Sequence, residues 1–340
     1  MNKVLIIAEA GVNHNGSLDL ALKLVDAAAA AGADVVKFQT FKAQQLASTS
    51  AKKASYQQDN DPSEDNTQLA MLSKLELPLD WHFTLKKHAE AQGITFASTA
   101  FDIDSLNFLA ELGLPFFKIP SGEITNRPLI EHIAKLGKEV ILSTGMATVS
   151  EIKEAIDVLL EGGVSRTQIT VLHCNTEYPT PMEDVNLNAM LAIQKELNVQ
   201  VGYSDHTLGV EVPIAAVAIG AKVIEKHFTL DQTMTGPDHK ASLEPAALKQ
   251  MVQAIRNIEL AISGTGEKAP SPSEIKNIVV ARKSICYASD MMPNDIISEA
   301  HLIMLRPGTG VSPMEYRQLI GKKLNKPVRK GDLFDWTDII

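Results

Sequence analysis

Short runs of hydrophobic residues alternate with amphipathic segments along most of the chain. Nearly every position in a run is apolar, which is typical of parallel strands that are buried on both faces. We expect eight strands, at Val4–Ala8, Val35–Phe38, Ile94–Ser98, Pro115–Ile119, Val140–Ser143, Ile169–His173, Val199–Tyr203 and Lys222–Glu225.

The segments between these runs place apolar residues three or four positions apart, which is the period of an α-helix. We expect eight helices, at Leu18–Ala31, Pro78–Gln92, Asp104–Leu112, Arg127–Leu136, Val149–Leu160, Leu187–Leu197, Val210–Ile219 and Pro245–Ile262. Eight strand–helix units predict an α/β fold, the (β/α)8 TIM barrel. A doubly wound open sheet is the structural alternative, and the lack of a Gly-x-Gly-x-x-Gly turn disfavours it.

One connection is much longer than the others. It runs from Phe41 to Leu77, is rich in Gln, Ser, Asp and Lys, and contains a helical stretch around Asn66–Leu75. Because it follows the second strand, we expect it at the C-terminal face of the barrel. Connections of this length are usually lids or disordered segments. The sequence leaves open whether this one covers a substrate.

The character of the sequence changes after the barrel domain, which we place at residues 1–262. Residues 263–282 form a linker rich in Gly, Pro and Ser, with a short helix expected at Glu274–Val280. Residues 283–340 alternate short strands with turns, and a domain of this size rarely has an adequate core by itself. We therefore expect this tail to pack on something else, such as another subunit. Its expected strands are Ser284–Ala288, Asp295–Ile297 and His301–Arg306.

The composition narrows the classes of partner. The chain carries 32 Lys and Arg against 41 Asp and Glu, a net charge of −9. Such a protein repels phosphate backbones, so we expect neither nucleic acid nor an anionic membrane as a partner. Its two cysteines, Cys174 and Cys286, form no Cys-x-x-Cys pair, which excludes thiolate zinc sites and disulfide scaffolds. No signal peptide or membrane-spanning run is evident, so a cytoplasmic protein is expected.

Polar or ionisable residues follow every expected strand. TIM-barrel enzymes carry their chemistry at the C-terminal ends of their strands. A purely structural barrel has no reason to place such residues at all of its strand ends, so the pattern predicts an active site there. The residues are Glu9, Lys37, Gln39, Ser98, Thr99, Lys118, Ser121, Glu123, Ser143, Thr144, His173, Asn175, Ser204, Asp205, His206, Glu225, Lys226 and His227.

His206 and His227 are 21 residues apart, which is about one strand–helix unit. They therefore end neighbouring strands and can face a common centre. Two imidazoles suit Mn²⁺, Fe²⁺, Co²⁺ or Zn²⁺, with water or substrate oxygens completing the shell. Candidate outer groups of this site are His14, His173 and His239. The histidines expected to be structural are His82, His88, His132 and His301.

Lysines and serines among the strand-end residues predict a site for a small dianion such as a phosphate ester, because cations and hydroxyls stabilise phosphate oxygens. They are Lys37, Lys118, Ser121, Ser143 and Ser204. Gly122 and Gly145 add backbone amides that suit oxyanions. Glu9 and Glu123 are carboxylates that can act as a general acid or base in a buried site.

Seven short motifs, in order along the chain, resemble those of the sialic acid synthase family. They are Ile7–Gly16 (IAEAGVNHNG), Phe117–Glu123 (FKIPSGE), Ile141–Met146 (ILSTGM), Tyr178–Pro181 (YPTP), Gly202–Thr207 (GYSDHT), Glu225–Phe228 (EKHF) and Gly236–Lys240 (GPDHK). The tail, with Arg306-Pro307-Gly308, is similar to the C-terminal antifreeze-like (SAF, β-clip) domain of that family. The resemblance covers nearly the whole chain and is nearest to bacterial N-acetylneuraminate and N,N′-diacetyllegionaminate synthases.

The resemblance implies a transferase that forms a carbon–carbon bond. Phosphoenolpyruvate would condense with an open-chain N-acetylmannosamine-type sugar, giving a nonulosonic (sialic or legionaminic) acid and phosphate. A divalent metal, Mn²⁺ before Mg²⁺ or Co²⁺, would bind to His206 and His227. The resemblance also implies a homodimer with swapped C-terminal domains, in which Arg306 reaches the sugar N-acetyl group in the other subunit.

The resemblance further implies a role for each site residue. Lys118, Ser121, Ser143 and Ser204 would hold the phosphate, and Lys37 and Thr99 the carboxylate. Thr176, preceded by Asn175, stands where the family often carries an Asn phosphate ligand. Glu9, Gln39, Tyr178 and Asp238 would bind the sugar. Glu123 would lie near the reacting carbons and share catalysis with Glu9 and Lys118.

Two other functions remain open at this stage. One is a Schiff-base pyruvate–sugar lyase with Lys118 or Lys226 as the amine. The other is a non-catalytic carbohydrate-binding protein. Within the synthase class the sugar is also open, because N-acetylmannosamine has a C6 hydroxyl, whereas the legionaminate precursor is 6-deoxy with a second acetamido group at C4.

Overall fold

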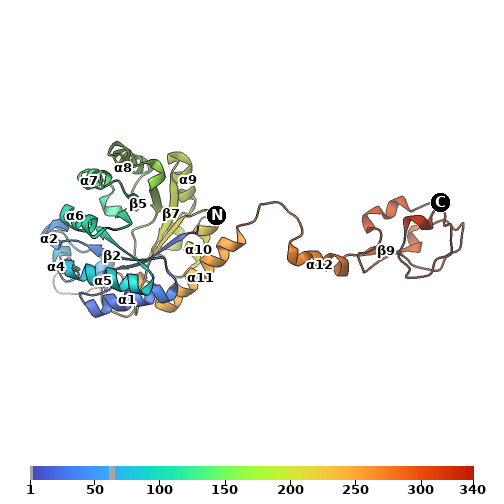
Figure 1. Cartoon of the computed structure of the whole chain (residues 1–340), viewed down its shortest axis with the longest axis horizontal. Coiled ribbons are helices and arrows are strands. Elements are labelled where there is room, and N and C mark those ends of the chain that lie inside the picture. Colours follow the sequence, from blue (N-terminus) through green and yellow to red (C-terminus); the bar gives the residue numbers. More distant parts are fainter. Residues whose placement is uncertain (1–2, 61–65) are drawn as a thin grey trace. The chain divides into compact units, whose positions relative to one another are not determined.

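The computed structural model describes residues 3–60 and 66–340. Its contacts divide the chain into two compact units, Met1–Gly264 and Thr265–Ile340. Figure 1 draws the first unit from blue to light orange and the second from orange to red. The expected barrel lies in the first unit, and almost all of the expected linker and tail lie in the second.

The first unit is a nearly closed TIM barrel, which confirms the predicted fold. Its eight parallel strands are hydrogen-bonded in the order β3-β2-β1-β8-β7-β6-β5-β4. The two end strands of this order, β3 and β4, contact each other and bring the sheet round on itself. The strands are β1 Leu5–Gly11, β2 Val35–Thr40, β3 Thr95–Ala100, β4 Phe116–Ile119, β5 Glu139–Ser143, β6 Ile169–His173, β7 Gln200–Asp205 and β8 Val223–His227.

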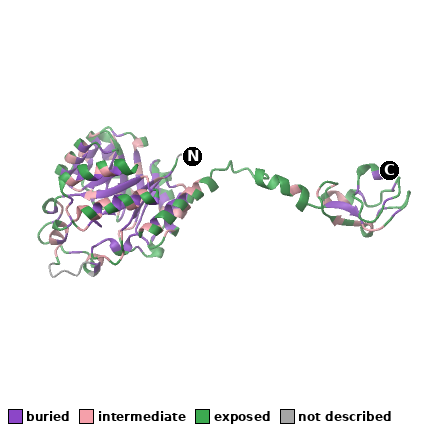
Figure 2. Ribbon diagram, turned by 60° about the horizontal axis from the view of Figure 1, so that its bottom comes forward, coloured by how far each residue is buried: buried purple, intermediate pink, exposed green. Residues whose placement is uncertain are grey.

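Helices surround the sheet, and their outer faces are exposed (Figure 2). They begin where capping residues predict: at α8, for example, the Thr148 and Glu151 side chains each accept from the other's backbone N–H. The helix α1 ends at Gly32, whose φ of 84° favours glycine. The surrounding helices are α1 Leu18–Ala31, α5 Leu79–Gln92, α6 Ile103–Leu112, α7 Arg127–Lys135, α8 Val149–Glu161, α9 Asn188–Leu197, α10 Glu211–Ala218 and α11 Pro245–Ala261.

Alternation along the strands places an apolar layer beneath a polar one inside the barrel. In β1, Ile6 and Ala8 pack outward with the helices, whereas Ile7 packs inward. The inward apolar layer is Ile7, Val35, Ala97, Phe116, Ile141, Leu172 and Val223. Two positions later the side chains face inward again, at Glu9, Lys37, Thr99, Lys118, Ser143, Cys174 and Glu225. The apolar layer therefore supports a ring of functional groups at the C-terminal ends.

The long connection after β2 is partly helical in its described residues. It contains α2 Ala43–Leu46, α3 Ser55–Asn60 and α4 Gln68–Ser73, and an antiparallel bridge joins Lys52 to Thr67. The helix expected around Asn66–Leu75 is α4, which begins at Gln68 because the Thr67 hydroxyl accepts from the Ala70 amide. Residues 61–65 of the predicted connection lie outside the described residues.

The second unit contains α12 Pro272–Ala281 and an antiparallel pair, β9 Ser284–Tyr287 and β10 Leu302–Leu305. The predicted strand at Asp295–Ile297 is wrong, because only one residue of it, Ile296, forms a bridge, to Lys323. The small core of this unit is Ile285, Tyr287, Met291, Ile297, Leu319, Leu324, Val328 and Phe334.

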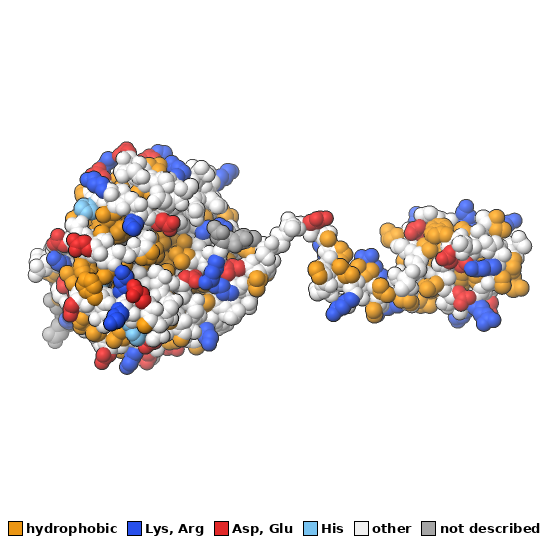
Figure 3. Space-filling model, in the orientation of Figure 1, with side chains coloured by type: hydrophobic (Ala, Val, Ile, Leu, Met, Phe, Trp, Pro, Cys, Tyr) orange, Lys and Arg blue, Asp and Glu red, His pale blue; other side chains and the backbone are white. Residues whose placement is uncertain are grey.

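Acidic and basic side chains are interspersed over the face of the first unit seen in Figure 3. Charges of both signs are therefore mixed on that face. Of the helices in residues 3–60 and 66–340, none is both long and apolar enough to cross a membrane.

Candidate active site

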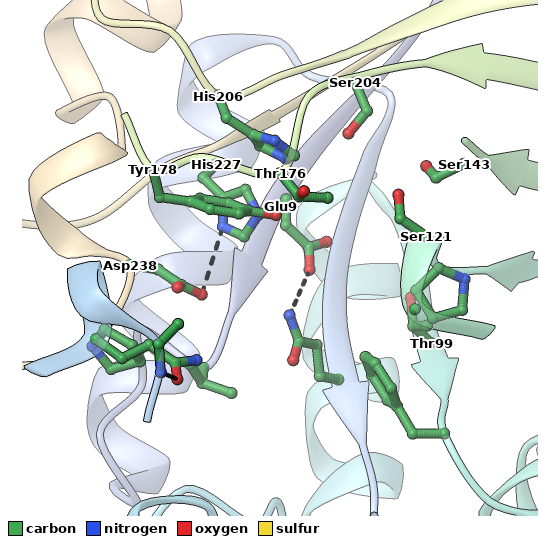
Figure 4. A pocket seen from close by; sticks show the side chains of 18 of the residues that line it. Glu9, Thr99, Ser121, Ser143, Thr176, Tyr178, Ser204, His206, His227 and Asp238 are labelled. Carbon is green, nitrogen blue, oxygen red and sulfur yellow. Dashed lines mark hydrogen bonds and ion pairs between the residues drawn. The ribbon is translucent and has the colours of Figure 1, made fainter. Parts of the chain in front are cut away.

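A cavity of about 470 Å³ lies at the C-terminal ends of the strands. Figure 4 shows side chains from several strand ends converging on it. The predicted site residues that line it are Glu9, Lys37, Gln39, Thr99, Lys118, Ser121, Ser143, Thr176, Tyr178, Ser204, His206, His227 and Asp238. Most of the polar strand-end residues thus form one site, and those that do not line it are Ser98, Glu123, Thr144, His173, Asn175, Asp205 and Lys226.

Buried ion pairs occupy the floor of this cavity. Glu225 accepts from Lys118 Nζ at 2.9 Å and from Ser204 Oγ at 3.0 Å, both at Oε1. Its other oxygen lies 3.6 Å from Lys37 Nζ. Lys37 Nζ also lies 2.5 Å from Glu9 Oε2 and donates to Thr99 Oγ1 at 3.0 Å. Two cations and two carboxylates therefore meet in a space largely closed to water.

Burial and ion pairing shift the pKa values of these groups in different directions. Burial raises the pKa of Glu9 to about 7, although Lys37 opposes the shift. Burial alone would also raise the pKa of Glu225, but Lys118 and Lys37 outweigh it and hold that pKa well below its usual range. The pKa of Lys37 rises despite burial, because Glu225 and Glu9 favour its charged form. Near neutral pH, Glu225 is the fixed anion and Glu9 the carboxylate that can exchange a proton.

A cradle for an anion adjoins Lys118. Ser143 Oγ is buried and has no hydrogen-bond partner among the described residues. Ser121 Oγ accepts from the Gly145 amide at 2.9 Å. A Cβ at Gly145 would lie 2.4 Å from Thr176 Cγ2, so only glycine fits there. An unpaired hydroxyl beside a lysine is what a phosphate oxygen needs.

His206 and His227 lie side by side, with ring centroids 5.4 Å apart. His206 Nδ1 bonds to the carbonyl of Asn175, which leaves Nε2 with its lone pair. His227 Nδ1 is buried without a hydrogen bond in the described part of the chain, and Asp238 Oδ2 lies 3.7 Å from it. Burial lowers the pKa of His206 to about 4 and that of His227 well below its usual value.

Two neutral, neighbouring imidazoles fit a divalent metal. Within residues 3–60 and 66–340, no set of three His, Cys, Asp or Glu side chains is arranged to hold a metal alone. Water or substrate oxygens would have to complete the shell, as predicted from the two histidines.

Aromatic rings connect the imidazoles to the long connection. Tyr178 stacks on His206 at a centroid distance of 4.1 Å and meets His227 edge-on at 5.7 Å. Tyr56 of α3 also stacks on Tyr178, at a centroid distance of 5.1 Å. Asn60 of the same helix donates to Pro237 O at 2.8 Å, next to Asp238. The connection therefore contributes a wall of the site.

Of the residues predicted to take part in catalysis or in binding, Glu123 and Arg306 do not line the cavity. Residues Ser121–Glu123 form one 3₁₀ turn, in which Gly122 faces the cavity and Glu123 Oε2 accepts from Asn126 Nδ2 at 2.6 Å. Glu123 therefore lies next to a residue that lines the cavity without lining it itself, and its place near the reacting carbons stays a prediction. Arg306 lies in the second unit, where its Nε donates to Ala281 O at 3.1 Å. Its role at the site stays a prediction.

Glu225 lies at the centre of the site, although sequence analysis named it only as a strand-end residue and assigned it no role of its own. The signal was present, because Glu225 stands two positions before His227 and so faces the same side of its strand. The expected outer histidines bond elsewhere: His14 to the Gly16 amide, His173 to Val185 O and His239 to Thr229 Oγ1. No sequence pattern pointed to Tyr56.

Comparison with known proteins extends over both units. Residues 24–268 match the NeuB family, and residues 282–340 match the SAF domain. The chain is 53% identical over 333 residues to N,N′-diacetyllegionaminic acid synthase of Campylobacter jejuni, which covers 98% of this chain and 99% of that protein. The Legionella pneumophila protein of the same name is 47% identical over 336 residues, covering 98% and 94%.

Solved structures agree with these matches. The crystal structure of N-acetylneuraminic acid (sialic acid) synthetase from Leptospira borgpetersenii, in complex with citrate, superposes with a TM-score of 0.70. That protein is 35% identical to this chain, and the match covers 82% of this chain and 90% of the other.

Proposed function

The chain belongs to the NeuB family, and from that premise we propose that its cavity condenses phosphoenolpyruvate with an open-chain N-acetylated amino sugar. Water is consumed, and a nonulosonic acid and phosphate are released. One observation carries this proposal: a single cavity contains both a site for an anion, formed by two lysines and an unpaired serine hydroxyl, and two neutral imidazoles that can bind a metal. The chain is thus a carbon–carbon bond-forming synthase.

Phosphoenolpyruvate fits the floor of the cavity. We assign its carboxylate to Lys37 and Thr99, which already share a hydrogen bond of 3.0 Å. Its phosphate is assigned to the side chains that surround the cradle: Lys118, Ser121, Ser143, Thr176 and Ser204. The entering dianion competes with Glu225 for the two lysines, so binding and release of phosphate both depend on that carboxylate.

His206 and His227 would hold the divalent metal, with Mn²⁺ proposed before Mg²⁺ or Co²⁺. When bound, such an ion supplies Lewis acidity toward a carbonyl oxygen. Two features of the chain favour metal binding. Burial keeps both imidazoles neutral, and the bond to Asn175 O fixes the tautomer of His206. Tyr178 limits the rotation of the His206 ring by stacking on it.

The sugar would lie between the floor and the aromatic side of the cavity. We assign Glu9, Gln39, Tyr178 and Asp238 to it. As the methylene carbon of phosphoenolpyruvate bonds to the aldehyde carbon, the aldehyde oxygen gains negative charge and needs a proton. Glu9, with its pKa near 7, is suited to give that proton, and Lys118 to balance charge on the departing phosphate.

The sugar we propose is a 2,4-diacetamido-2,4,6-trideoxymannose, which gives N,N′-diacetyllegionaminic acid. The two relatives of that name, at 53% and 47% identity, support it. N-acetylmannosamine, giving N-acetylneuraminic acid, is the second candidate, supported by the sialic acid synthetase structure. We also propose a cytoplasmic homodimer with swapped C-terminal domains, in which Arg306 completes the partner's site.

A Schiff-base lyase is less well supported. Lys118 Nζ is held by Glu225 at 2.9 Å, and Lys226 does not line the cavity but pairs with the buried Asp205. The deciding experiment measures phosphate release from phosphoenolpyruvate with Mn²⁺ and each of the two sugars. Release that depends on an acetylated sugar supports the synthase. No release with either sugar, or trapping of pyruvate on a lysine by borohydride, would overturn it.

A further inference from the structure

We propose that the long connection carries the residues that select the far end of the sugar, and that its apolar face receives a C6 methyl group. This inference rests on the proposed function. The residues concerned form an apolar wall, defined as Val12, Met71, Leu72, Leu75 and Phe101, all of which line the cavity.

The cavity has two chemically different sides. The floor carries the ion pairs and hydroxyls of the strand ends, whereas the apolar wall has no hydrogen-bonding side chain. Met71, Leu72 and Leu75 belong to α4 and the turn after it, and Val12 and Phe101 follow β1 and β3. A ligand that fills the cavity therefore touches charge at one end and hydrocarbon at the other.

The apolar wall is preformed. Together with Phe41 it makes a small hydrophobic cluster that is separate from the core of the barrel. Phe41 meets Phe101 edge-to-face at 6.0 Å, and Met71 and Leu75 are buried. The Ala43 amide donates to Glu76 Oε1 at 2.7 Å, which ties the start of the connection to its end. The wall therefore presents a fixed apolar surface rather than loose side chains.

The side of the cavity formed by the apolar wall also disfavours a sugar whose far end is charged. Among the described residues that line the cavity, the lysines are Lys37 and Lys118, and both lie on the floor. Beside its apolar side chains the connection adds the amides of Gln57 and Gln68 and the phenol of Tyr56, and none of its described lining residues is charged. Amides pair with acetamido groups, and hydrocarbon accommodates a methyl group but leaves a hydroxyl or phosphate without partners.

The orientation of the sugar follows from its chemistry. Its aldehyde carbon must lie on the floor, beside phosphoenolpyruvate and His206. The opposite end of the open chain, carrying C6, then points away from the strand ends toward the wall. A 6-deoxy sugar with acetamido groups matches this surface better than a fully hydroxylated one.

The test compares kcat/KM for three sugars: N-acetylmannosamine, its 6-deoxy form, and the 2,4-diacetamido-2,4,6-trideoxy sugar. The 6-deoxy form isolates the methyl group. We expect it to exceed N-acetylmannosamine by about tenfold, since a hydrophobic pocket distinguishes such groups by about 10–200-fold. In Leu72→Asn and Met71→Gln that advantage should shrink to within about twofold, while the KM for phosphoenolpyruvate stays unchanged.

Leu69→Asn is the matched control, because Leu69 lies on the same helix but neither lines the cavity nor joins the apolar wall. It should keep the wild-type preference. Equal rates for the 6-deoxy and hydroxylated sugars in the wild type, or an unchanged preference in the folded wall variants, would overturn the inference while leaving the synthase intact. Failure of all three sugars would instead reject the proposed function. The comparison of the 6-deoxy and hydroxylated sugars with the wild-type protein tests the inference even if a variant does not fold.

Discussion

At the scale of single residues, Glu225 sets the charge that an entering anion meets. It is buried, contacts both Lys37 and Lys118, and stays ionised because those lysines hold its pKa low. A buried ion pair gains little net stability, but removing one partner leaves an uncompensated charge. Glu225 therefore neutralises the two buried lysines and stabilises the ligand-free fold until phosphoenolpyruvate binds to them.

Replacing Glu225 by Gln should destabilise the ligand-free protein by about 3 kcal/mol, because Lys118 loses its carboxylate partner. Phosphoenolpyruvate should then raise the melting temperature more in the variant than in the wild type, since it now supplies the missing anion. Thermal unfolding with and without the ligand measures both effects. Glu123→Gln is the control and should show the wild-type shift. Equal shifts in Glu225→Gln and the wild type would show that Glu225 does not compete with the ligand.

Another residue-scale prediction concerns His82, which is fully buried and bonded to Thr40 Oγ1 at 2.7 Å. Burial lowers its pKa from 6.5 to about 4. As the pH falls, the unfolded chain therefore protonates His82 at a higher pH than the folded protein does. The contribution of the neutral imidazole to stability is fully present above pH 6.5 and is lost as the pH falls toward 4. In His82→Gln, the slope of the unfolding free energy against pH should fall by about 1.2 kcal/mol per pH unit between about pH 4.5 and 6.

Urea unfolding across that pH range measures the slope for His82. The substitution also removes the bond to Thr40, so the absolute stability drops at every pH and is not the readout. Near pH 8 the imidazole is neutral in both states, and the two slopes should coincide there. An unchanged slope in the acid range would mean that His82 binds its proton equally well in the folded protein.

At the scale of the elements, alternation explains why most of the site was predictable. An apolar residue such as Val35 or Phe116 fixes the inward face of its strand, and the next inward position is then Lys37 or Lys118. Alternation does not determine which way Glu123 faces, because this residue lies on a 3₁₀ turn beyond β4. The wall from the long connection was equally hidden, since its position depends on tertiary packing rather than on a local period.

The neighbouring strands β7 and β8 carry a second ion pair that faces away from the cavity. Asp205 and Lys226 are fully buried and lie 2.5 Å apart, and Asp205 Oδ1 also accepts from the Thr207 amide at 3.0 Å. Each residue adjoins one imidazole, His206 or His227. We expect this pair to hold the two rings at their metal-binding separation.

In Lys226→Met, the affinity for Mn²⁺, measured by electron paramagnetic resonance without substrates, should fall by about 10–100-fold, the usual cost of losing support for a metal ligand. The double variant Asp205→Leu/Lys226→Met removes both charges and should regain stability but not affinity. Arg256→Met breaks the pair with Asp34, 2.6 Å apart at the start of the barrel strands, and should leave Mn²⁺ binding unchanged. Wild-type affinity in the folded Lys226→Met protein would show that the pair supports only the fold.

At the scale of the whole molecule, the second unit combines a small core with several exposed apolar side chains. Its core is small, and Val280, Met292 and Met314 are 67%, 64% and 90% exposed. Apolar side chains mark an interaction surface where they lie together as one patch. Together with Arg306, which lies in this unit, they favour the proposed dimer in which one subunit's tail serves the other's cavity.

Mixing two variants, each impaired at a sugar concentration near the wild-type KM, tests that exchange directly. Arg306→Ala has an intact cavity but lacks the arginine of the tail. Lys118→Ala has an intact tail but lacks the lysine of the cavity. If tails are swapped, each mixed dimer pairs the intact cavity of one subunit with the intact tail of the other and so has one complete site. Refolding the two variants together at equal amounts yields mixed dimers as about half of the population, so phosphate release should return to about a quarter of the wild-type rate. Arg306→Ala alone should raise the KM for the sugar more than that for phosphoenolpyruvate. If Arg306 instead served its own subunit, no mixture would contain a complete site, and activity would stay at the level of the separate variants.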